Sequence, residues 1–340
     1  MPRQSGFAAP AASGARLWYQ ATCIGLCLLA FCGATAADQY KTFDPPGSTC
    51  TSAEAVNRSQ TVAGYYFDGS YHGFARTPDG TLSEFDPQGS IQTFASSIDS
   101  KGVITGSFDY SDGQTHGFLR SPRGKITVFD PPESITTAPA SISKGTIAGT
   151  YYLSNGLILG FVRARAGTFA VFDVPNWYAT FPYAVNAKGE TTGDAWDGDT
   201  IFQPFVRTAD GMITTFDIGT NAFSLGINDK GVIVGYYSDD NAQHGFLRAP
   251  DGTITSFDPP GCTDTSALSI DAKGDVTGYC SSVGAVVGFL RSASGEFTLF
   301  NPPGSAGTQP AGIARIGAGT AIAGSYSDGG GVCHGFLRTN

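Results

Sequence analysis

Short runs of β-branched and aromatic residues alternate with turn residues from residue 40 to the end of the chain. The clearest unit, residues 227–258, reads INDKGVIVGYYSDDNAQHGFLRAPDGTITSFD. Its GF-x-R core recurs seven times in steps of 41 to 47 residues, with the phenylalanine at Phe74, Phe118, Phe161, Phe205, Phe246, Phe289 and Phe336. A repeat of this length that contains only strand-type runs is typical of propeller blades rather than of helical solenoids. The pattern therefore predicts an all-β fold.

Each unit divides into four strands, because clusters of Gly, Asn, Asp and Pro separate the apolar runs. In the fifth unit we expect strands over residues 223–227, 232–237, 244–249 and 253–257. The phrase DPPG at residues 258–261 then ends the pairing, since proline lacks the amide hydrogen that a β-ladder needs. We interpret this phrase as the connection between blades.

The phenylalanine that ends the fourth strand also has seven copies, at Phe43, Phe85, Phe129, Phe172, Phe216, Phe257 and Phe300. The first copy precedes the first GF-x-R core, and only residues 337–340 follow the last core. The last unit therefore lacks an outer strand, and we expect residues 40–43 to supply it beside residues 334–338. This predicts a seven-bladed β-propeller with four antiparallel strands per blade, closed by the mature N-terminal strand in the last blade, without free sheet edges at the seam.

A length of 340 residues would ordinarily suggest two domains, but one periodicity continues without a linker. We therefore expect a single domain over residues 38–340. Its repeats lie at about 45–86, 87–130, 131–173, 174–217, 218–258, 259–301 and 302–340 plus 40–44.

The first 37 residues have a different character. Arg3 and Arg16 precede an apolar run over residues 21–34, and Ala34-Thr35-Ala36 matches a signal-peptidase site. We expect residues 1–37 to be a signal peptide that is cleaved near Ala36, leaving a secreted, extracellular or periplasmic protein without a membrane anchor. The alternative is an uncleaved anchor, but the run is shorter than the roughly 20 residues that span a bilayer.

Four of the seven cysteines remain after cleavage, and an exported protein meets an oxidising compartment. Four cysteines allow three pairings. Blade topology favours Cys50 with Cys333 and Cys262 with Cys280, because the connections between blades and the loops between the second and third strands lie on the same face.

A net charge of −9 and a pI near 4.8 argue against nucleic acid or anionic lipid as a partner. The four histidines, His72, His116, His244 and His334, all precede a GF core, so we expect them to bond a loop backbone rather than to act in catalysis or bind a metal. The repeated aspartates before proline are expected to cap their own turns. Irregular loop acids make the same face acidic and leave Ca²⁺ binding open, but no ligand spacing organises them. We assign no catalytic residue, metal or cofactor.

The fourth unit breaks the repeat, and a residue that the repeat does not explain is a better candidate for function. Trp177 and Tyr178 follow its connecting phrase, and Trp196, Asp197 and Asp199 end its second strand. Exposed rings beside carboxylates suit a sugar or a peptide, so these five residues are our candidate ligand site. Alternatively, the aromatic residues fill a gap between blades 3 and 4.

The phrases HGFLR at 244–248, FDPPG at 257–261 and INDKG at 227–231 resemble the HAF family of probable extracellular repeats. The likeness covers residues 40–340 and implies an exported bacterial repeat protein. It implies no activity and no catalytic residue. Blade 4 departs from the pattern at Pro204.

These observations favour a monomeric binding or scaffold module for an extracellular glycan or protein over an enzyme. The rival hypothesis is a glycan hydrolase or lyase that acts at the loop-rich face. A single acid or histidine outside the repeat, buried at the channel mouth, would favour the enzyme, whereas an exposed aromatic platform without such a group would favour binding.

Overall fold

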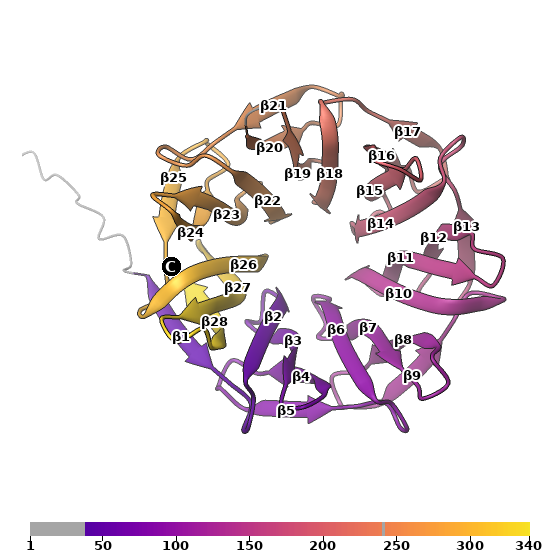
Figure 1. Ribbon diagram of the computed structural model, residues 1–340, viewed down its shortest axis with the longest axis horizontal. Helices are drawn as coiled ribbons and strands as arrows, with labels where there is room; N and C mark the ends of the chain where they lie inside the picture. Colours follow the sequence, from indigo (N-terminus) through magenta and orange to yellow (C-terminus); the bar gives the residue numbers. More distant parts are fainter. Residues whose placement is uncertain (1–37, 240–241) are drawn as a thin grey trace, which may run out of the picture. The chain divides into compact units, whose positions relative to one another are not determined.

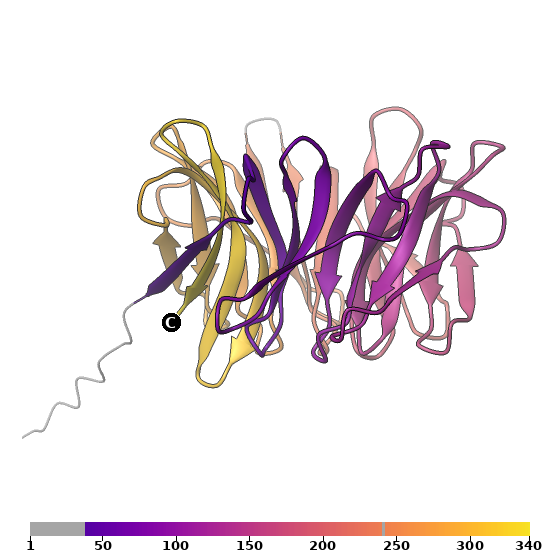
Figure 2. The same cartoon turned by 90° about the horizontal axis from the view of Figure 1, so that it is seen from below.

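The computed structural model describes residues 38–239 and 242–340, and the predicted signal peptide lies outside these residues. The described part contains 28 strands and no helix, which confirms the all-β prediction. The strands fall into groups of four that are joined by antiparallel pairing, and we call each group a blade. Figure 1 shows the blades arranged around a central opening, and Figure 2 shows their loops at the two ends of the disc formed by residues 38–340.

The bounds are given by the place of each strand in its blade. The first strands are β2 (Cys50–Val56), β6 (Gln92–Ile98), β10 (Ser134–Ser143), β14 (Ala179–Val185), β18 (Thr220–Ile227), β22 (Thr265–Ile270) and β26 (Ser305–Ile316). The second strands are β3 (Val62–Phe67), β7 (Ile104–Asp109), β11 (Thr146–Leu153), β15 (Thr191–Trp196), β19 (Ile233–Ser238), β23 (Val276–Ser282) and β27 (Gly319–Asp328). The third strands are β4 (Tyr71–Arg76), β8 (Thr115–Arg120), β12 (Ile158–Arg163), β16 (Phe202–Arg207), β20 (Gln243–Arg248), β24 (Ala285–Arg291) and β28 (Cys333–Thr339). The fourth strands are β5 (Leu82–Phe85), β9 (Ile126–Phe129), β13 (Phe169–Phe172), β17 (Ile213–Thr215), β21 (Ile254–Phe257), β25 (Phe297–Phe300) and, in the last blade, β1 (Gln39–Phe43).

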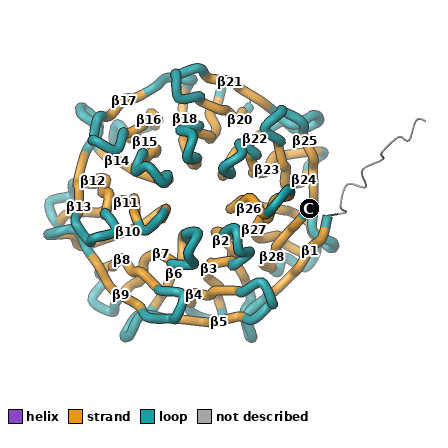
Figure 3. Tube along the Cα trace, turned by 180° about the vertical axis from the view of Figure 1, so that it is seen from behind, coloured by secondary structure: helices purple, strands orange, loops and turns teal. Residues whose placement is uncertain are grey.

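The four strands of blade 5 begin and end within three residues of the predicted bounds. The first strands lie innermost and the fourth strands form the outer rim, as the view from behind also shows (Figure 3). Because direction alternates along each blade, the connections between blades and the loops between second and third strands lie at one end of the disc. The turns that join first to second strands and third to fourth strands lie at the other end.

One contact repeats at each junction between neighbouring blades. The arginine of each GF-x-R core lies over the phenylalanine at the end of the preceding blade, which closes the fourth strand or, in blade 4, directly follows it; the guanidinium carbon is 4.7 to 5.1 Å from the ring centroid. The pairs are Arg76–Phe43, Arg120–Phe85, Arg163–Phe129, Arg207–Phe172, Arg248–Phe216, Arg291–Phe257 and Arg338–Phe300. The core phenylalanine of the same blade meets the same ring edge-on, at 5.7 to 6.4 Å between centroids. The two repeated phrases thus form one interface.

The GF core needs a glycine because the phenylalanine at the end of the fourth strand lies directly over it. A Cβ atom at Gly335 would lie 2.7 Å from the ring of Phe43, which crosses it from the paired strand. In blade 4 the position is Pro204, and there β17 ends one residue earlier, at Thr215. We attribute the shorter strand to the proline ring, which occupies space that the glycine leaves open elsewhere; the Phe216 amide still donates to the Pro204 carbonyl at 3.0 Å.

The N-terminal strand β1 pairs with β28 in the register Tyr40↔Arg338 and Phe43↔Gly335. Arg338, which is 1% exposed, also forms a 2.7 Å ion pair with Asp38. At the other end of β28, Cys50 is bonded to Cys333, which confirms that predicted disulfide and links the ends of the described chain. Cys262 is bonded to Cys280 within blade 6.

The repeated histidines bond side chains, so the expectation of bonds to a loop backbone is wrong. In each case Nδ1 lies 2.7 to 2.8 Å from the aspartate that follows the fourth strand of the same blade. The pairs are His72–Asp86, His116–Asp130, His244–Asp258 and His334–Asp44. The other oxygen of Asp44 accepts a bond from Thr51 at 2.7 Å, and that of Asp130 accepts one from Thr137 at 2.6 Å. These aspartates therefore connect neighbouring blades instead of capping only their own turns.

Deletion of residues 38–44 should cause aggregation, because it exposes the edge of β28 and removes the ring beneath Arg76. The single change Phe43→Ala should lower the free energy of unfolding by about 3–5 kcal/mol, since this side chain is 8% exposed. Size-exclusion chromatography measures the aggregation, and chemical denaturation measures the free energy of unfolding. Lys41→Ala, at an exposed position of the same strand, is the control. A deletion variant as monomeric and stable as the parent would contradict this role of β1.

The pair of His334 and Asp44 should make stability depend on pH. The hydrogen bond that His334 donates to the Asp44 carboxylate raises the pKa of His334 against the opposing effect of burial, with a further contribution from Asp328. Because the pKa of the histidine is higher in the folded than in the unfolded state, protonation stabilises the fold. This stabilisation is complete below the unfolded-state pKa of about 6.5, and it is lost as the pH rises through the folded-state pKa. In the parent, the free energy of unfolding should increase as the pH falls from about 8 to about 6. His334→Gln should make this increase smaller. Urea titrations at several pH values measure the free energy of unfolding of the parent and the variant. If it changes with pH in the same way in both proteins, His334 does not cause the pH dependence.

Candidate functional site

The face that carries the connections between blades is strongly acidic, and we call it the acidic face. Among the described residues, its connections and the adjoining strand ends contain many carboxylates and no lysine or arginine. The carboxylates are Asp44, Asp68, Asp86, Asp109, Asp112, Asp130, Glu133, Asp173, Asp197, Asp199, Asp217, Asp239, Asp258, Asp264 and Asp328. Charge of one sign over a whole face attracts cations and repels anions.

Two of the predicted blade 4 residues are part of a longer row of rings on the acidic face. The Tyr178 side chain, which is 56% exposed, meets Trp196 edge-on at 5.5 Å between centroids. Trp196 stacks on Phe202 at 6.0 Å, and Phe202 contacts Phe223 of blade 5 at 4.9 Å. Phe223 in turn lies 5.0 Å from Tyr236. We call these five residues the aromatic tract; it crosses the junction between blades 4 and 5.

The other predicted residues have local roles. Trp177 is half-buried and packs against the cluster of Val174, Ala195 and Phe205, which Phe172 of blade 3 also joins, so for this residue the structure favours the alternative that the ring fills the space between blades 3 and 4. Asp197 caps its own loop by accepting bonds from the Asp199 and Ile201 amides, and the Asp199 amide contributes most to the lowered pKa of this carboxyl. The backbone carbonyl of Asp199 accepts the indole N–H of Trp196 at 3.3 Å. Tyr178 and Trp196 therefore remain as the rings available to a ligand.

Sequence reasoning missed Asp194, a fully buried carboxyl beneath the aromatic tract. Its Oδ1 accepts the Ser224 amide of blade 5 at 2.9 Å, while Oδ2 has no hydrogen-bond partner among the described residues. Burial raises the pKa of Asp194 well above the usual value. Burial also raises the pKa of Tyr236 to about 12, with smaller contributions from Tyr279 and Asp194. The signal was present in the sequence, because the other blades have Tyr, Ser or Thr at this position.

A ring of aliphatic side chains narrows the channel between two cavities. Val56, Ile98, Val185, Ile227, Ile270 and Ile313 line both cavities, and Ile142 lines the one at the turn end. The cavity nearer the acidic face has a volume of about 210 Å³ and contains one acid that departs from the repeat, Glu54. Burial raises the pKa of this carboxyl. This is the kind of isolated channel acid that the enzyme hypothesis needs.

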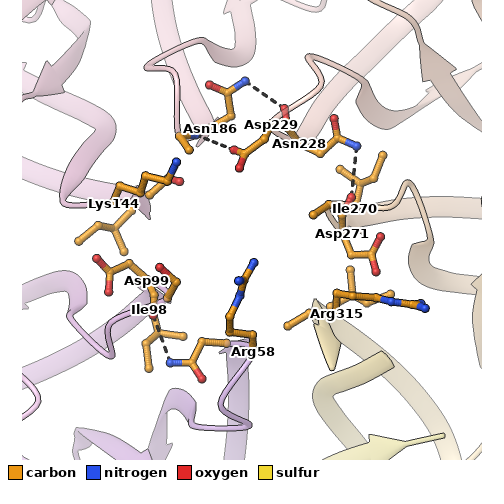
Figure 4. Close-up of a pocket in the computed structure, with 18 of the residues that line it drawn as sticks. Arg58, Ile98, Asp99, Lys144, Asn186, Asn228, Asp229, Ile270, Asp271 and Arg315 are labelled. Carbon is orange, nitrogen blue, oxygen red and sulfur yellow. Dashed lines mark hydrogen bonds between the residues drawn. The ribbon is translucent and has the colours of Figure 1, made fainter. Parts of the chain in front are cut away.

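The cavity at the turn end, of about 260 Å³, is polar and carries both signs of charge (Figure 4). Asn186 and Asn228 donate to backbone carbonyls of the next blade at 3.0 and 3.2 Å, so their amides hold neighbouring blades together. Arg315 is held by Asp275 at 3.1 Å, and Figure 4 shows Arg58 directed toward the middle of the ring. Both acids and cations lie around this mouth, so its charge favours no single class of ligand.

Within the described residues, no group of three or more His, Cys, Asp or Glu side chains is placed to hold a metal ion. The same part of the chain contains no helix that is long and apolar enough to cross a membrane.

Comparison with known proteins identifies the fold. No family model and no curated protein matches the chain. Among solved structures, a catalytically inactive variant of virginiamycin B lyase from Staphylococcus aureus with quinupristin aligns with a TM-score of 0.60 and 16% identity, over 89% of this chain and 100% of that one. A puromycin hydrolase variant complexed with PGG aligns at 0.58 and 13% identity over 86% of this chain and 55% of that one. At such low identity the likeness establishes a shared fold, that of β-propeller enzymes, and no shared activity.

Proposed function

We propose that this chain is a secreted seven-bladed β-propeller, closed by β1, that binds an extracellular glycan through the aromatic tract on its acidic face. The observation that carries the proposal is the edge of this tract in the blade that breaks the repeat, where the exposed Tyr178 ring meets the half-buried Trp196 ring. The remaining rings are also half-buried, and they fix Trp196 and Tyr178 in place. A protein partner is the alternative ligand at the same surface.

The chemistry suits a sugar chain. Flat rings offer apolar area to the C–H face of a pyranose at low cost in side-chain entropy. The Asp199 carboxylate lies in the adjoining exposed loop, where a carboxylate can accept hydroxyl hydrogen bonds. Trp177 and Asp197 support the site by packing and by capping the loop.

Secretion is part of the proposal and is supported by two features. Residues 1–37 have the pattern of a cleaved signal peptide, and disulfides such as Cys50–Cys333 persist in oxidising compartments. The repeat phrases that resemble the HAF family agree with export. We propose that the exported protein is a monomer without a cofactor.

A glycan array probed with residues 38–340 should identify a bound sugar. Tyr178→Ala and Trp196→Ala should each weaken that binding by about 30-fold, equal to about 2 kcal/mol, because both truncate a central ring of the surface. The melting temperature should change little for Tyr178→Ala, whose side chain is 56% exposed.

Met212→Ala is the matched control, since this side chain is 63% exposed but lies on a turn at the opposite end of the disc. Unchanged binding in both aromatic variants would reject the tract as the glycan site. A large loss of stability in Tyr178→Ala would instead mean that the ring serves packing.

A second candidate function is hydrolysis or elimination on a glycan in the channel, and Glu54 is the observation that favours it. Glycoside hydrolysis usually needs two carboxyls at one bond, and Glu54 is the only carboxyl among the described residues that line this cavity. Assaying the sugars bound on the array for release of reducing ends separates this candidate from simple binding.

A further inference from the structure

Each first strand carries a β-bulge, and the seven bulge residues come together in the channel. A register shift against the second strand leaves one extra residue at the equivalent position of each of β2, β6, β10, β14, β18, β22 and β26, and β10, β18 and β26 have a second shift nearer the acidic face. These residues are Glu54, Ser96, Ala140, Tyr183, Leu225, Leu268 and Ala311, and all of them line the cavity of about 210 Å³ nearer the acidic face. Because a bulge turns its extra residue out of the ladder, the repeat itself builds this ring.

The cavity has an apolar side and a single charged group. Leu225, Leu268 and Ala311 follow one another around the ring, and the aliphatic constriction lies at its inner end. Glu54 is the only charged side chain among the described residues that line it. The Glu54 Oε1 atom accepts a bond from the Ser52 hydroxyl at 2.6 Å, which leaves Oε2 for another donor.

Tyr183 of blade 4, three blades away from Glu54, is the one aromatic residue among the described residues that line the same cavity. The cations of the channel lie elsewhere: Arg58, Lys144 and Arg315 line the cavity beyond the aliphatic constriction. An anion that entered from the acidic face would meet Glu54 with no positive charge to balance it. A neutral alkyl group would leave this carboxylate partly buried without a counter-charge, which is costly.

We propose that this cavity binds a primary ammonium group carried on an alkyl chain, with the ammonium between Glu54 and the Tyr183 ring and the alkyl chain against Leu225 and Leu268. A carboxylate with one free oxygen and an aromatic face are both favourable contacts for an ammonium. The acidic face raises the local concentration of cations at the mouth. A free alkylamine and a lysine side chain share this chemistry.

The inference is independent of the glycan proposal, because the cavity and the aromatic tract have no residue in common. Loss of glycan binding in Tyr178→Ala should leave amine binding unchanged. Failure of one proposal is therefore distinguishable from failure of the other.

The test is calorimetric titration of residues 38–340 with butylammonium chloride, sodium butyrate and 1-butanol at neutral pH. Saturable 1:1 binding is expected for butylammonium alone, and it should weaken as salt screens the acidic face. A short peptide with a free lysine, compared with its acetyl-lysine form, distinguishes a protein source from a free amine. If neither butylammonium nor the lysine peptide binds, the proposal is overturned.

Glu54→Gln should weaken butylammonium binding at least tenfold while keeping the acceptor for Ser52. Glu133→Gln removes the same charge from an exposed position on the acidic face outside the cavity, so it is the matched control and should bind nearly as the parent does. Equal weakening in both variants, or comparable binding of butyrate or butanol, would refute a specific site. If Glu54→Gln does not fold, a crystal of the parent soaked with butylammonium decides the question by whether the nitrogen lies within hydrogen-bond distance of Glu54.

Discussion

The fold depends on one interaction that is repeated at each junction between blades: an arginine stacked on a phenylalanine of the preceding blade. Each arginine is largely withdrawn from water, and burial lowers the pKa of the guanidinium in examples such as Arg76 and Arg120. The Nε atoms of Arg76 and Arg120 have no hydrogen-bond partner among the described residues. A planar, weakly hydrated cation is better suited to such a place than a lysine, because it gains dispersion and cation–π attraction over its whole face.

This interaction explains why the two phrases of the repeat occur together. The ring that receives the arginine also lies across the glycine of its own blade, so GF-x-R and the terminal phenylalanine must both be present for each blade to join its neighbours. At the seam the ring comes from Phe43, at the other end of the chain. The aspartate that follows it connects His334 of the last blade with Thr51 of the first. Residues 43–44 therefore provide both the ring for Arg76 and the aspartate that joins the last blade to the first.

The period of the sequence and the count of its two half-phrases were sufficient to predict the strands and the place of β1, because both follow from local turn chemistry and from one repeated contact. The blade 4 candidates were found because they break the repeat. The aromatic tract could not be found in this way: Phe202 and Phe223 occupy ordinary strand positions in different blades, and only the packing of those blades brings them together. The partner of each histidine was missed because the bond joins side chains 14 residues apart within a blade, or 290 residues apart at the seam.

The same contacts that make the blades alike leave few positions free for function. Strand residues that face a neighbouring blade must fit the Arg–Phe junction, so most departures from the repeat lie in the loops and among the bulge residues in the channel, with Asp194 and Pro204 as exceptions in the strands of blade 4. The arrangement of the strands also places the repeated positive and negative side chains at opposite ends of the disc. The core arginines all stand at the turn end of the third strands, while the aspartates that follow the fourth strands stand at the other end. The described residues therefore form one strongly acidic face and one face of mixed charge, so only the acidic end of the channel selects its ligands by charge.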